Sequence, residues 1–170
     1  SVVRAKRGPT DILRMSHVAL YVPDAAEALP WFTEKLGFIV SDYVETPDGK
    51  LAGVFCRCDR GAELCDHHVL ALVSDARGTI HHASFWVEDF DALHIGSDWL
   101  TRAGHRHEFG IGRHTLGSQV FDYWRDPDGF LLERYTDGDV FDNTRSAEHV
   151  PASLEAFFQW GGDPKPTFFD

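Results

Sequence analysis

The fold is decided by two stretches that resemble each other, His17-Val-Ala-Leu-Tyr-Val-Pro-Asp24 and His82-Ala-Ser-Phe-Trp-Val-Glu-Asp89. Both begin with histidine, run through mostly apolar residues to a valine in the sixth position, and end in aspartate. Runs of apolar and aromatic residues are typical of strands. Aspartate often caps the first turn of a helix, because its carboxylate accepts the unpaired amide hydrogens there. The two stretches therefore predict the same unit twice, a strand that leads into a helix.

The residues that follow extend this likeness into a full repeat. Helices are predicted over 25–36 and 90–103, and Gly37 and Gly104 suit the left-handed backbone of a helix end. Pro30 predicts a break or a second helical start within the first helix. Turn residues then separate three predicted strands in each half. These strands cover 38–44, 51–58 and 68–73 in the first half and 105–109, 118–125 and 130–136 in the second.

The order βαβββ therefore occurs twice, which predicts an α+β fold. Two such units pair their sheets into a half-open barrel, and the concave face of that barrel collects side chains from both copies. We expect an N-terminal arm over 1–15 and one module over 16–140, followed by a C-terminal extension over 141–170. Within the module the two repeats are expected at about 16–75 and 81–136.

The C-terminal extension carries more aromatic side chains than a small module needs for its own core. Exposed apolar surface of that kind usually marks a contact between molecules. We therefore expect the extension to pack on the module or on a neighbouring molecule, and the protein to form a homo-oligomer. The residues behind this expectation are Phe157, Phe158, Trp160, Phe168 and Phe169.

The composition argues against several classes of protein. The chain has 170 residues, with 16 Lys and Arg against 27 Asp and Glu, and a formal net charge of −11. Nucleic-acid binding needs a surplus of basic side chains on one surface, and the longest basic run here, 4–7, is short. No stretch approaches the roughly 20 apolar residues of a membrane span, and no signal-peptide pattern opens the sequence. We expect a soluble protein with neither nucleic acid nor a membrane as partner.

The cysteines point to a reducing compartment. Cys56, Cys58 and Cys65 are an odd number close together, so they cannot build the disulfide framework of a small secreted domain. The expected location is the cytoplasm. A zinc cluster of these thiols with His67 and His68 is the alternative, but C-x-C lacks the turn by which C-x-x-C converges on a tetrahedral ion. We therefore expect three buried, unreactive thiols.

Three polar residues lie on otherwise apolar strands, where burial is costly without a partner. His17 and His82 begin the two equivalent strands, and Glu133 interrupts the apolar run of the last one. A lone strand histidine is more often a hydrogen-bonded core residue than a metal ligand. Matching positions in two repeats favour a metal here, because the internal symmetry brings His17 and His82 together. Two imidazoles and one carboxylate with open positions suit Fe(II) sites that bind substrate and O2, and also Zn, Mn or Co.

Other polar residues are weighed against this metal site. His68, His114 and Tyr123 are expected to surround it. His81 is expected to face the opposite side of its strand from His82, since neighbouring strand residues alternate. His105 and His107 are expected to be solvated. The glycine pair at 110 and 112 is only a weak signal for a phosphate-binding loop. The residues expected in the hydrophobic core are Met15, Phe55, Phe85, Trp86 and Phe121.

These residues resemble the type I extradiol catechol dioxygenases of the vicinal-oxygen-chelate superfamily. The resemblance covers about residues 12–140. It rests on His82-Ala-Ser-Phe, Gly110-x-Gly-Arg-His114, Tyr123 nine residues later, Asp126-Pro-Asp-Gly129 followed by Glu133-x-Tyr135, and His68 fourteen residues before His82. It implies that His17, His82 and Glu133 bind Fe(II), or Mn(II) as in some members. It also implies that His68, His114 and Tyr123 surround the metal and the substrate.

The resemblance implies an activity as well. Such a protein opens the ring of a catechol beside its diol with O2 as cosubstrate. His68 is the expected acid and base for the substrate's protons, and Tyr123 and His114 are expected to orient a substrate oxygen. Many members carry two modules, whereas this sequence shows only the catalytic one, so its natural boundaries stay open.

Two other functions use the same scaffold. Glyoxalase I-like and fosfomycin-resistance-like enzymes have nearly the same ligands, but they do not call for His68, His114 and Tyr123 together. Metal-free modules that sequester a drug have no use for three buried metal-type ligands. The substrate is expected to be an uncharged, aryl- or alkyl-substituted catechol, since related enzymes that act on carboxylate-bearing catechols have arginine where this chain has Phe109. The arginines that could serve instead are Arg60, Arg106 and Arg113.

Overall fold

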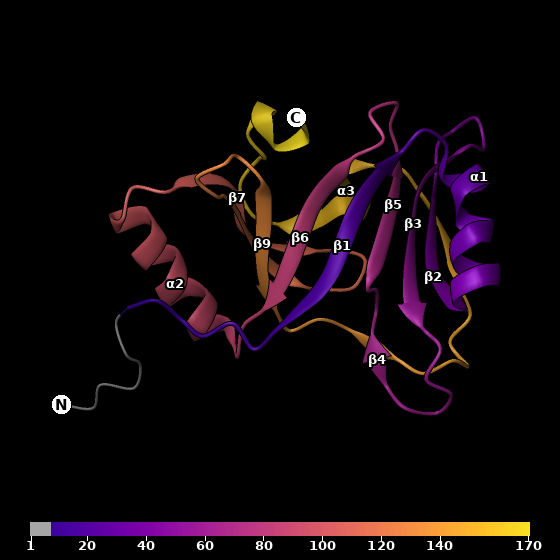
Figure 1. Cartoon of the computed structure of the whole chain (residues 1–170), viewed down its shortest axis with the longest axis horizontal. Helices are drawn as coiled ribbons and strands as arrows, with labels where there is room; N and C mark the ends of the chain where they lie inside the picture. Colours follow the sequence, from indigo (N-terminus) through magenta and orange to yellow (C-terminus); the bar gives the residue numbers. More distant parts are fainter. Residues whose placement is uncertain (1–7) are drawn as a thin grey trace.

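A computed structural model describes residues 8–170 of the chain, and in it a ten-stranded mixed sheet carries both repeats (Figure 1). The basic run at 4–7 and about half of the expected N-terminal arm lie outside the described residues. The first repeat contains β1 (Arg14–Val22), α1 (Ala25–Pro30), the π-helical turn η1 (Trp31–Lys35), β2 (Phe38–Glu45), β3 (Leu51–Cys58), β4 (Cys65–Asp66) and β5 (Leu70–Ser74). The second contains β6 (Ile80–Trp86), α2 (Phe90–Arg102), β7 (Arg106–His114), β8 (Val120–Arg125) and β9 (Leu131–Thr136).

The two halves of the sheet are arranged alike around its middle. The strand order is β11-β2-β3-β5-β1-β6-β9-β8-β7-β12, and β1 pairs antiparallel with β6 at the centre. On one side β1 pairs parallel with β5, and on the other β6 pairs parallel with β9. The next pairs outward, β5 with β3 and β9 with β8, are antiparallel in both halves. The predicted α+β fold with two βαβββ repeats is therefore confirmed, and the two halves join in one mixed sheet.

The helix ends follow the sequence signals. Asp24 accepts hydrogen bonds from the amides of Ala26 and Glu27, and Asp89 accepts one from Ala92. Gly37 and Gly104 both have φ near +80°, at +74° and +80°, which glycine adopts without steric cost. The predicted break at Pro30 is also confirmed, because α-helical bonding ends there and a π-helical turn follows.

Strand β7 is longer than predicted, because it continues through both glycines to His114. A Cβ on Gly112 would lie 2.5 Å from Cζ of Phe121 and 2.7 Å from the carbonyl oxygen of Trp160. The glycine pair thus allows neighbouring strands to approach closely. The weak phosphate-loop signal has no structural counterpart, since these residues belong to a strand.

Residues after β9 return to the module and add strands to both edges of the sheet. β11 (Glu148–Pro151) pairs with β2, β12 (Phe158–Trp160) pairs with β7, and the two-residue β10 (Val140–Phe141) pairs with β4. Between and after them lie α3 (Leu154–Phe157) and the 3-10 helix η2 (Pro166–Phe169). The module boundaries expected at 16 and 140 stay predictions. None of the helices within 8–170 has the length and apolar character that a membrane crossing requires.

Three hydrophobic cores are found among the described residues, and the smallest contains Val87, Leu93 and Val120. The other two lie in the two halves of the sheet. The first joins α1 to the β2-β3-β5 side and includes Ala25, Val54 and Leu72, all nearly inaccessible to solvent. The second is aromatic and includes Phe109, Phe121, Tyr123, Leu131 and Phe168, with Phe157 and Phe158 packed against it.

This second core corrects the view that the tail aromatics exceed what the module needs. Phe157, Phe158 and Phe168 complete the module's own core, whereas Trp160 and Phe169 remain exposed. Met15 was also expected in the core, but its side chain on β1 is 59% exposed. Of the other expected core residues, Phe121 is buried and Phe55, Phe85 and Trp86 are half-buried.

The first core predicts a stability difference between two leucines. Leu72→Ala should lower the free energy of unfolding by about 2–5 kcal/mol, because it leaves a cavity at a fully buried position. Leu64→Ala is the matched control, since that side chain is 64% exposed and should change the value by no more than about 0.5 kcal/mol. Urea unfolding of both variants measures the difference. Equal effects would contradict the assigned core.

Candidate metal centre

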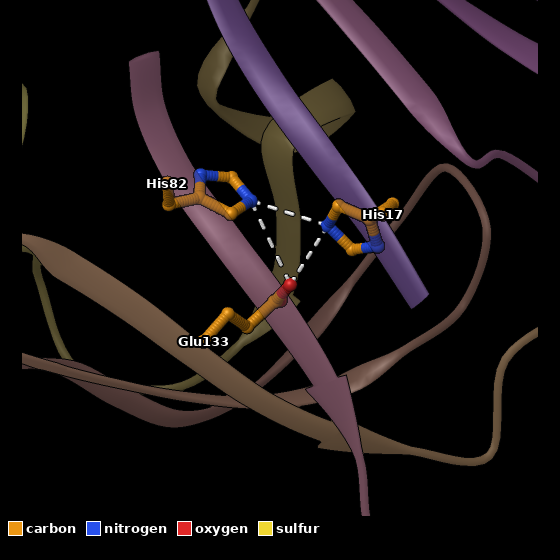
Figure 2. Close-up of side chains that lie close together, drawn as sticks. All are labelled: His17, His82 and Glu133. Carbon is orange, nitrogen blue, oxygen red and sulfur yellow. Dashed lines mark hydrogen bonds and ion pairs between the residues drawn. The ribbon is translucent and has the colours of Figure 1, made fainter. Parts of the chain in front are cut away.

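Three neighbouring strands bring His17, His82 and Glu133 together (Figure 2). His17 lies on β1, where the register against β6 shifts by one residue between Met15 and Val18. Such a bulge breaks the alternation of the strand, and Ser16 and His17 are both buried although they are consecutive. His82 lies on β6, and Glu133 on β9 pairs with Ser84 of the same strand. The side chains converge on one point, as the sequence predicted for its two matching histidines.

The contacts within this cluster are short. Nε2 of His17 lies 3.1 Å from Nε2 of His82 and 2.9 Å from Oε2 of Glu133, and Nε2 of His82 lies 3.7 Å from the same oxygen. The three residues are 3%, 8% and 0% exposed. Three potential ligand atoms, all buried and all near one another, form the arrangement that a metal ion requires.

The polar atoms of the cluster also fit a cation. Nδ1 of His17 and both carboxylate oxygens of Glu133 are buried and have no hydrogen-bond partner among the described residues. Buried polar atoms without partners are costly, and a carboxylate more so than a neutral group. Burial alone would raise the pKa of Glu133, but the electrostatic influence of the neighbouring imidazoles of His17, His114 and His82 outweighs burial and holds that pKa well below its ordinary value. Glu133 is thus an anion, as a ligand must be.

His81 orients the ring of His82, although the sequence predicted that His81 faces away. The register of β1 against β6 shifts between Ala19 and Leu20, and His81 is the extra residue on β6. Its Nε2 donates to the carbonyl oxygen of Phe168 at 3.0 Å, and its Nδ1 lies 2.8 Å from Nδ1 of His82. A neutral His81 has its hydrogen on Nε2, so its Nδ1 can only accept a hydrogen bond from Nδ1 of His82. His82 therefore carries its hydrogen on Nδ1, and the lone pair on its Nε2 is free for a metal. The sequence signal that could have indicated this role is the pair of consecutive histidines, His81 and His82.

The three residues expected around the metal do lie around this cluster. The ring of His68 lies 4.2 Å from that of His17, and the ring of Tyr123 lies 5.3 Å from that of His82, both measured between centroids. Tyr123 pairs with Glu133 across β8 and β9, so their side chains share a face. Nε2 of His114 lies 3.5 Å from Oε1 of Glu133.

His114 and Tyr123 are joined in a defined direction. Nδ1 of His114 donates to the carbonyl oxygen of Phe157 at 2.9 Å, because a carbonyl can only accept. In a neutral His114, Nε2 then accepts the hydroxyl hydrogen of Tyr123, also at 2.9 Å. Burial, with the charge of Glu133 as a second cause, raises the pKa of Tyr123 well above its ordinary value, so the phenol keeps its proton.

The cluster lies at a cavity of about 290 Å³ with mostly apolar walls. The polar residues on its surface are concentrated at His17, His82 and Glu133 and around His68, His114 and Tyr123. Tail residues close part of the cavity, among them Phe157, Phe168 and Phe169. None of the described residues that line it is Lys or Arg. An apolar pocket with a few convergent polar groups is the usual form of a small-molecule site.

Other sequence expectations are corrected here. His105 is exposed, but His107 is only half exposed and its Nε2 lies 2.9 Å from Oδ1 of the buried Asp122. Within 8–170 the cysteines form no group suited to a metal. Cys56 is buried, and desolvation raises the pKa of its thiol to about 12, whereas Cys58 and Cys65 are half-buried rather than buried.

A family profile matches residues 14–133, under the description Glyoxalase/Bleomycin resistance protein/Dioxygenase superfamily. The chain belongs to this superfamily. Among superfamily relatives, the chain is 36% identical to "Metapyrocatechase 2" of Cupriavidus necator over 161 residues, which are 92% of this chain and 46% of that protein. It is 29% identical to "Biphenyl-2,3-diol 1,2-dioxygenase" of Pseudomonas sp. (strain KKS102) over 123 residues, 70% of this chain and 40% of that protein.

A solved structure of the superfamily has the same fold. The Mn(II)-bound glyoxalase from Novosphingobium aromaticivorans superposes with a TM-score of 0.81 at 26% identity, covering 92% of this chain and 49% of that one. The chain thus spans about half the length, or less, of the relatives it matches.

The buried histidines predict a loss of stability in acid. Burial, as the main cause, lowers the pKa of His81 to about 4 and those of His68 and His82 well below the ordinary value. Below about pH 6.5 the unfolded chain therefore binds protons that the folded chain refuses, and each such histidine lowers the free energy of unfolding of the metal-free protein by up to about 1.4 kcal/mol per pH unit. Glu133, whose pKa is also lowered in the folded protein, adds a further loss below about pH 4.5.

Urea unfolding at pH 7, 6 and 5 measures this dependence. His81→Gln should flatten the slope, and His105→Gln, at an exposed position, should leave it unchanged. A slope in His81→Gln equal to that of the unsubstituted protein would contradict the assignment.

Proposed function

We propose that this chain is the catalytic module of a metal-dependent extradiol dioxygenase, which opens the ring of a catechol-type substrate beside its diol with O2. The observation that carries the proposal is the position of His68, His114 and Tyr123 around the His17, His82 and Glu133 cluster at one apolar cavity. The names of the curated relatives support the same reaction class.

His17, His82 and Glu133 would hold the metal, with Fe(II) proposed and Mn(II) as the alternative. The Mn(II)-bound glyoxalase of the same fold supports the alternative. A redox-active ion there supplies positive charge that favours loss of the diol protons and a route for electrons between ring and O2. Three protein ligands leave room for a chelating diol and O2.

His68 is the proposed proton carrier. Burial, with the charges of His17 and His67 as further causes, holds its pKa well below the ordinary value, so the ring is neutral at pH 7 and can accept a proton. Its position beside His17 places it next to a diol bound at the cluster. A proton taken there can be returned to an oxygen of the same substrate later in the reaction.

Tyr123 and His114 are proposed to orient the substrate. The Tyr123 hydroxyl keeps its hydrogen, and the Phe157 carbonyl fixes the His114 ring. The Tyr123 oxygen can still accept a hydrogen bond, or the hydroxyl can turn its hydrogen from His114 to a substrate oxygen and leave Nε2 of His114 as an acceptor. Both groups lie beside Glu133, where a substrate oxygen would lie. Such pre-set donors and acceptors favour one pose of the ring over others.

The substrate is proposed to be an uncharged catechol with an apolar substituent. A carboxylate would lie unpaired against the apolar wall, since none of the described residues lining the cavity is Lys or Arg. Phe109 belongs to the aromatic core. The arginines that could have served are engaged elsewhere: Arg60 with Glu63, Arg106 with Glu108, and Arg113 with Asp137.

A homo-oligomer remains a prediction of this proposal. The tail no longer supplies its main support, but several large apolar side chains elsewhere are exposed, including Leu13, Met15 and Phe130. Light scattering at micromolar concentration measures the state, and a monomer would contradict the prediction.

Anaerobic reconstitution with Fe(II), followed by addition of O2 and alkyl- or aryl-substituted catechols, tests the function. The expected result is a yellow ring-fission product, with kcat/KM higher for 3- or 4-alkylcatechols than for carboxylate-bearing ones. Conversion of a hemithioacetal instead, with no ring cleavage by Fe(II)- or Mn(II)-loaded protein, would favour the glyoxalase-like alternative and overturn the proposal.

His68→Phe and His17→Ala should differ in a diagnostic way. His68→Phe is expected to keep the metal and lose turnover by roughly 10²–10⁴-fold, because it removes only a proton carrier. His17→Ala should lose the metal itself, because one of three ligands is gone. Metal content and single-turnover spectra are measured on both variants. Full activity in His68→Phe, or metal loss equal to that of His17→Ala, would contradict the role of His68.

A further inference from the structure

A buried row of three side chains leads away from the cavity at His68. It consists of His68, His67 and Asp42, which are 4%, 1% and 3% exposed. Nδ1 of His68 lies 2.9 Å from Nδ1 of His67, and Nε2 of His67 lies 2.6 Å from Oδ2 of Asp42. β2 supplies Asp42, and the two histidines connect β4 to β5. Residues distant in sequence thus meet behind the proposed proton carrier.

The direction of each hydrogen bond follows from the chemistry of its partners. A carboxylate only accepts, so the contact with Asp42 places a hydrogen on Nε2 of His67. A neutral His67 then has a bare Nδ1, and the hydrogen between the two imidazoles belongs to Nδ1 of His68. Nε2 of His68 keeps its lone pair. Since His68 lines the cavity, this lone pair is available to a substrate.

We propose that Asp42 and His67 are positioning residues, which hold His68 in the tautomer whose free Nε2 serves the cavity. This inference rests on the proposed function, in which that nitrogen accepts a proton from a substrate hydroxyl. The opposite tautomer would present an N–H to the cavity and could not accept. Neither positioning residue touches the substrate.

The surroundings of His67 fix its ring. The Ser41 hydroxyl donates to the carbonyl oxygen of His67, and the amide of His67 donates to the carbonyl oxygen of Asp139 at 2.9 Å. Gly117, with φ at +76°, leaves room for the ring, because a Cβ there would lie 2.9 Å from Nδ1 of His67. A ring held on several sides can transmit the preference of Asp42 to His68.

Gln119 is the other polar side chain near Nδ1 of His68, with its Nε2 at 3.4 Å. A half-turn of the amide exchanges its nitrogen and oxygen, and its oxygen has no partner among the described residues in the present orientation. After that half-turn the oxygen accepts from Nδ1 of His68. The Gln119 contact therefore suits the proposed tautomer.

The His81 and His82 pair has the same construction with a different final acceptor. In the first pair, the Phe168 carbonyl fixes His81, and through it His82, which would remain a neutral ligand. In the second pair, the Asp42 carboxylate fixes His67, and through it His68, which would become a cation. A carboxylate stabilises the charge that His68 acquires with a proton, which a carbonyl does less well. The difference in final acceptor matches the difference in proposed role.

Nitrogen NMR of the chain labelled with ¹⁵N-histidine tests the proposal directly. Spectra are recorded at about pH 8, where exposed histidines are neutral, with and without diamagnetic Zn(II). The expected result for His68 is a protonated Nδ1 and a bare Nε2. Asp42→Asn should shift His68 toward the other tautomer, because an amide can donate to His67 and no longer dictates the direction.

Asp122→Asn is the matched control, because Asp122 is another buried carboxylate that contacts a histidine, His107, and neither of these residues lines the cavity. It should leave the His68 tautomer unchanged. With Fe(II) and a catechol, Asp42→Asn should lower kcat by about 10-fold or more with KM within about threefold, as for other residues that orient a reacting group.

A bare Nδ1 with a protonated Nε2 on His68 in the unsubstituted protein would overturn the proposal, and so would an unchanged tautomer in folded Asp42→Asn. If Asp42→Asn does not fold, the spectrum of the unsubstituted protein decides. The NMR result does not depend on turnover. Absence of ring cleavage would therefore count against the proposed function alone, and the tautomer would still be measured.

Discussion

The antiparallel pairing of β1 with β6 is the contact on which the site depends. It joins the two repeats at the centre of the sheet, so equivalent residues of the two halves become neighbours. Each of these two strands also contains one extra residue, which interrupts the alternation of side chains between the two faces of the sheet. The bulge in β1 buries His17 beside Ser16, and the bulge in β6 brings His81 against His82. Regular strands would have turned one of each pair away.

Burial makes the polar cluster selective for a cation. Water cannot solvate Glu133, and none of the described residues donates a hydrogen bond to its oxygens. The neighbouring imidazoles can stabilise this carboxylate either by donating protons to it or by binding a metal together with it. The hydrogen bonds of His81 favour the metal, because they leave Nε2 of His82 without a hydrogen. His82 receives its orientation from His81, which in turn is fixed by a carbonyl of the tail. The electrostatics of the centre thus reach from the core strands into the C-terminal residues.

The tail also shapes the cavity. Phe168 belongs to the second core and lines the cavity, while its carbonyl oxygen fixes His81. η2 is tied to the module by Thr167, whose hydroxyl donates to the buried carboxylate of Glu108 at 2.6 Å. One short segment therefore contributes to packing, to the apolar wall and to the orientation of a proposed ligand. This combination explains why aromatic residues accumulate near the end of the chain.

The sequence by itself determined the repeat and the helix ends, because these follow from local patterns. Symmetry between the two similar segments predicted that His17 and His82 meet, and Glu133 was expected beside them as the charged residue of an otherwise apolar strand. The sequence did not determine the role of His81 or the row from His68 to Asp42. Those depend on bulges and on partners 25 or more positions away, such as Asp42 for His67 and Phe168 for His81. Alternation along a strand predicts which face a side chain takes only while the register is regular. Only the tertiary structure decided where that register shifts and which distant groups accept the hydrogen bonds.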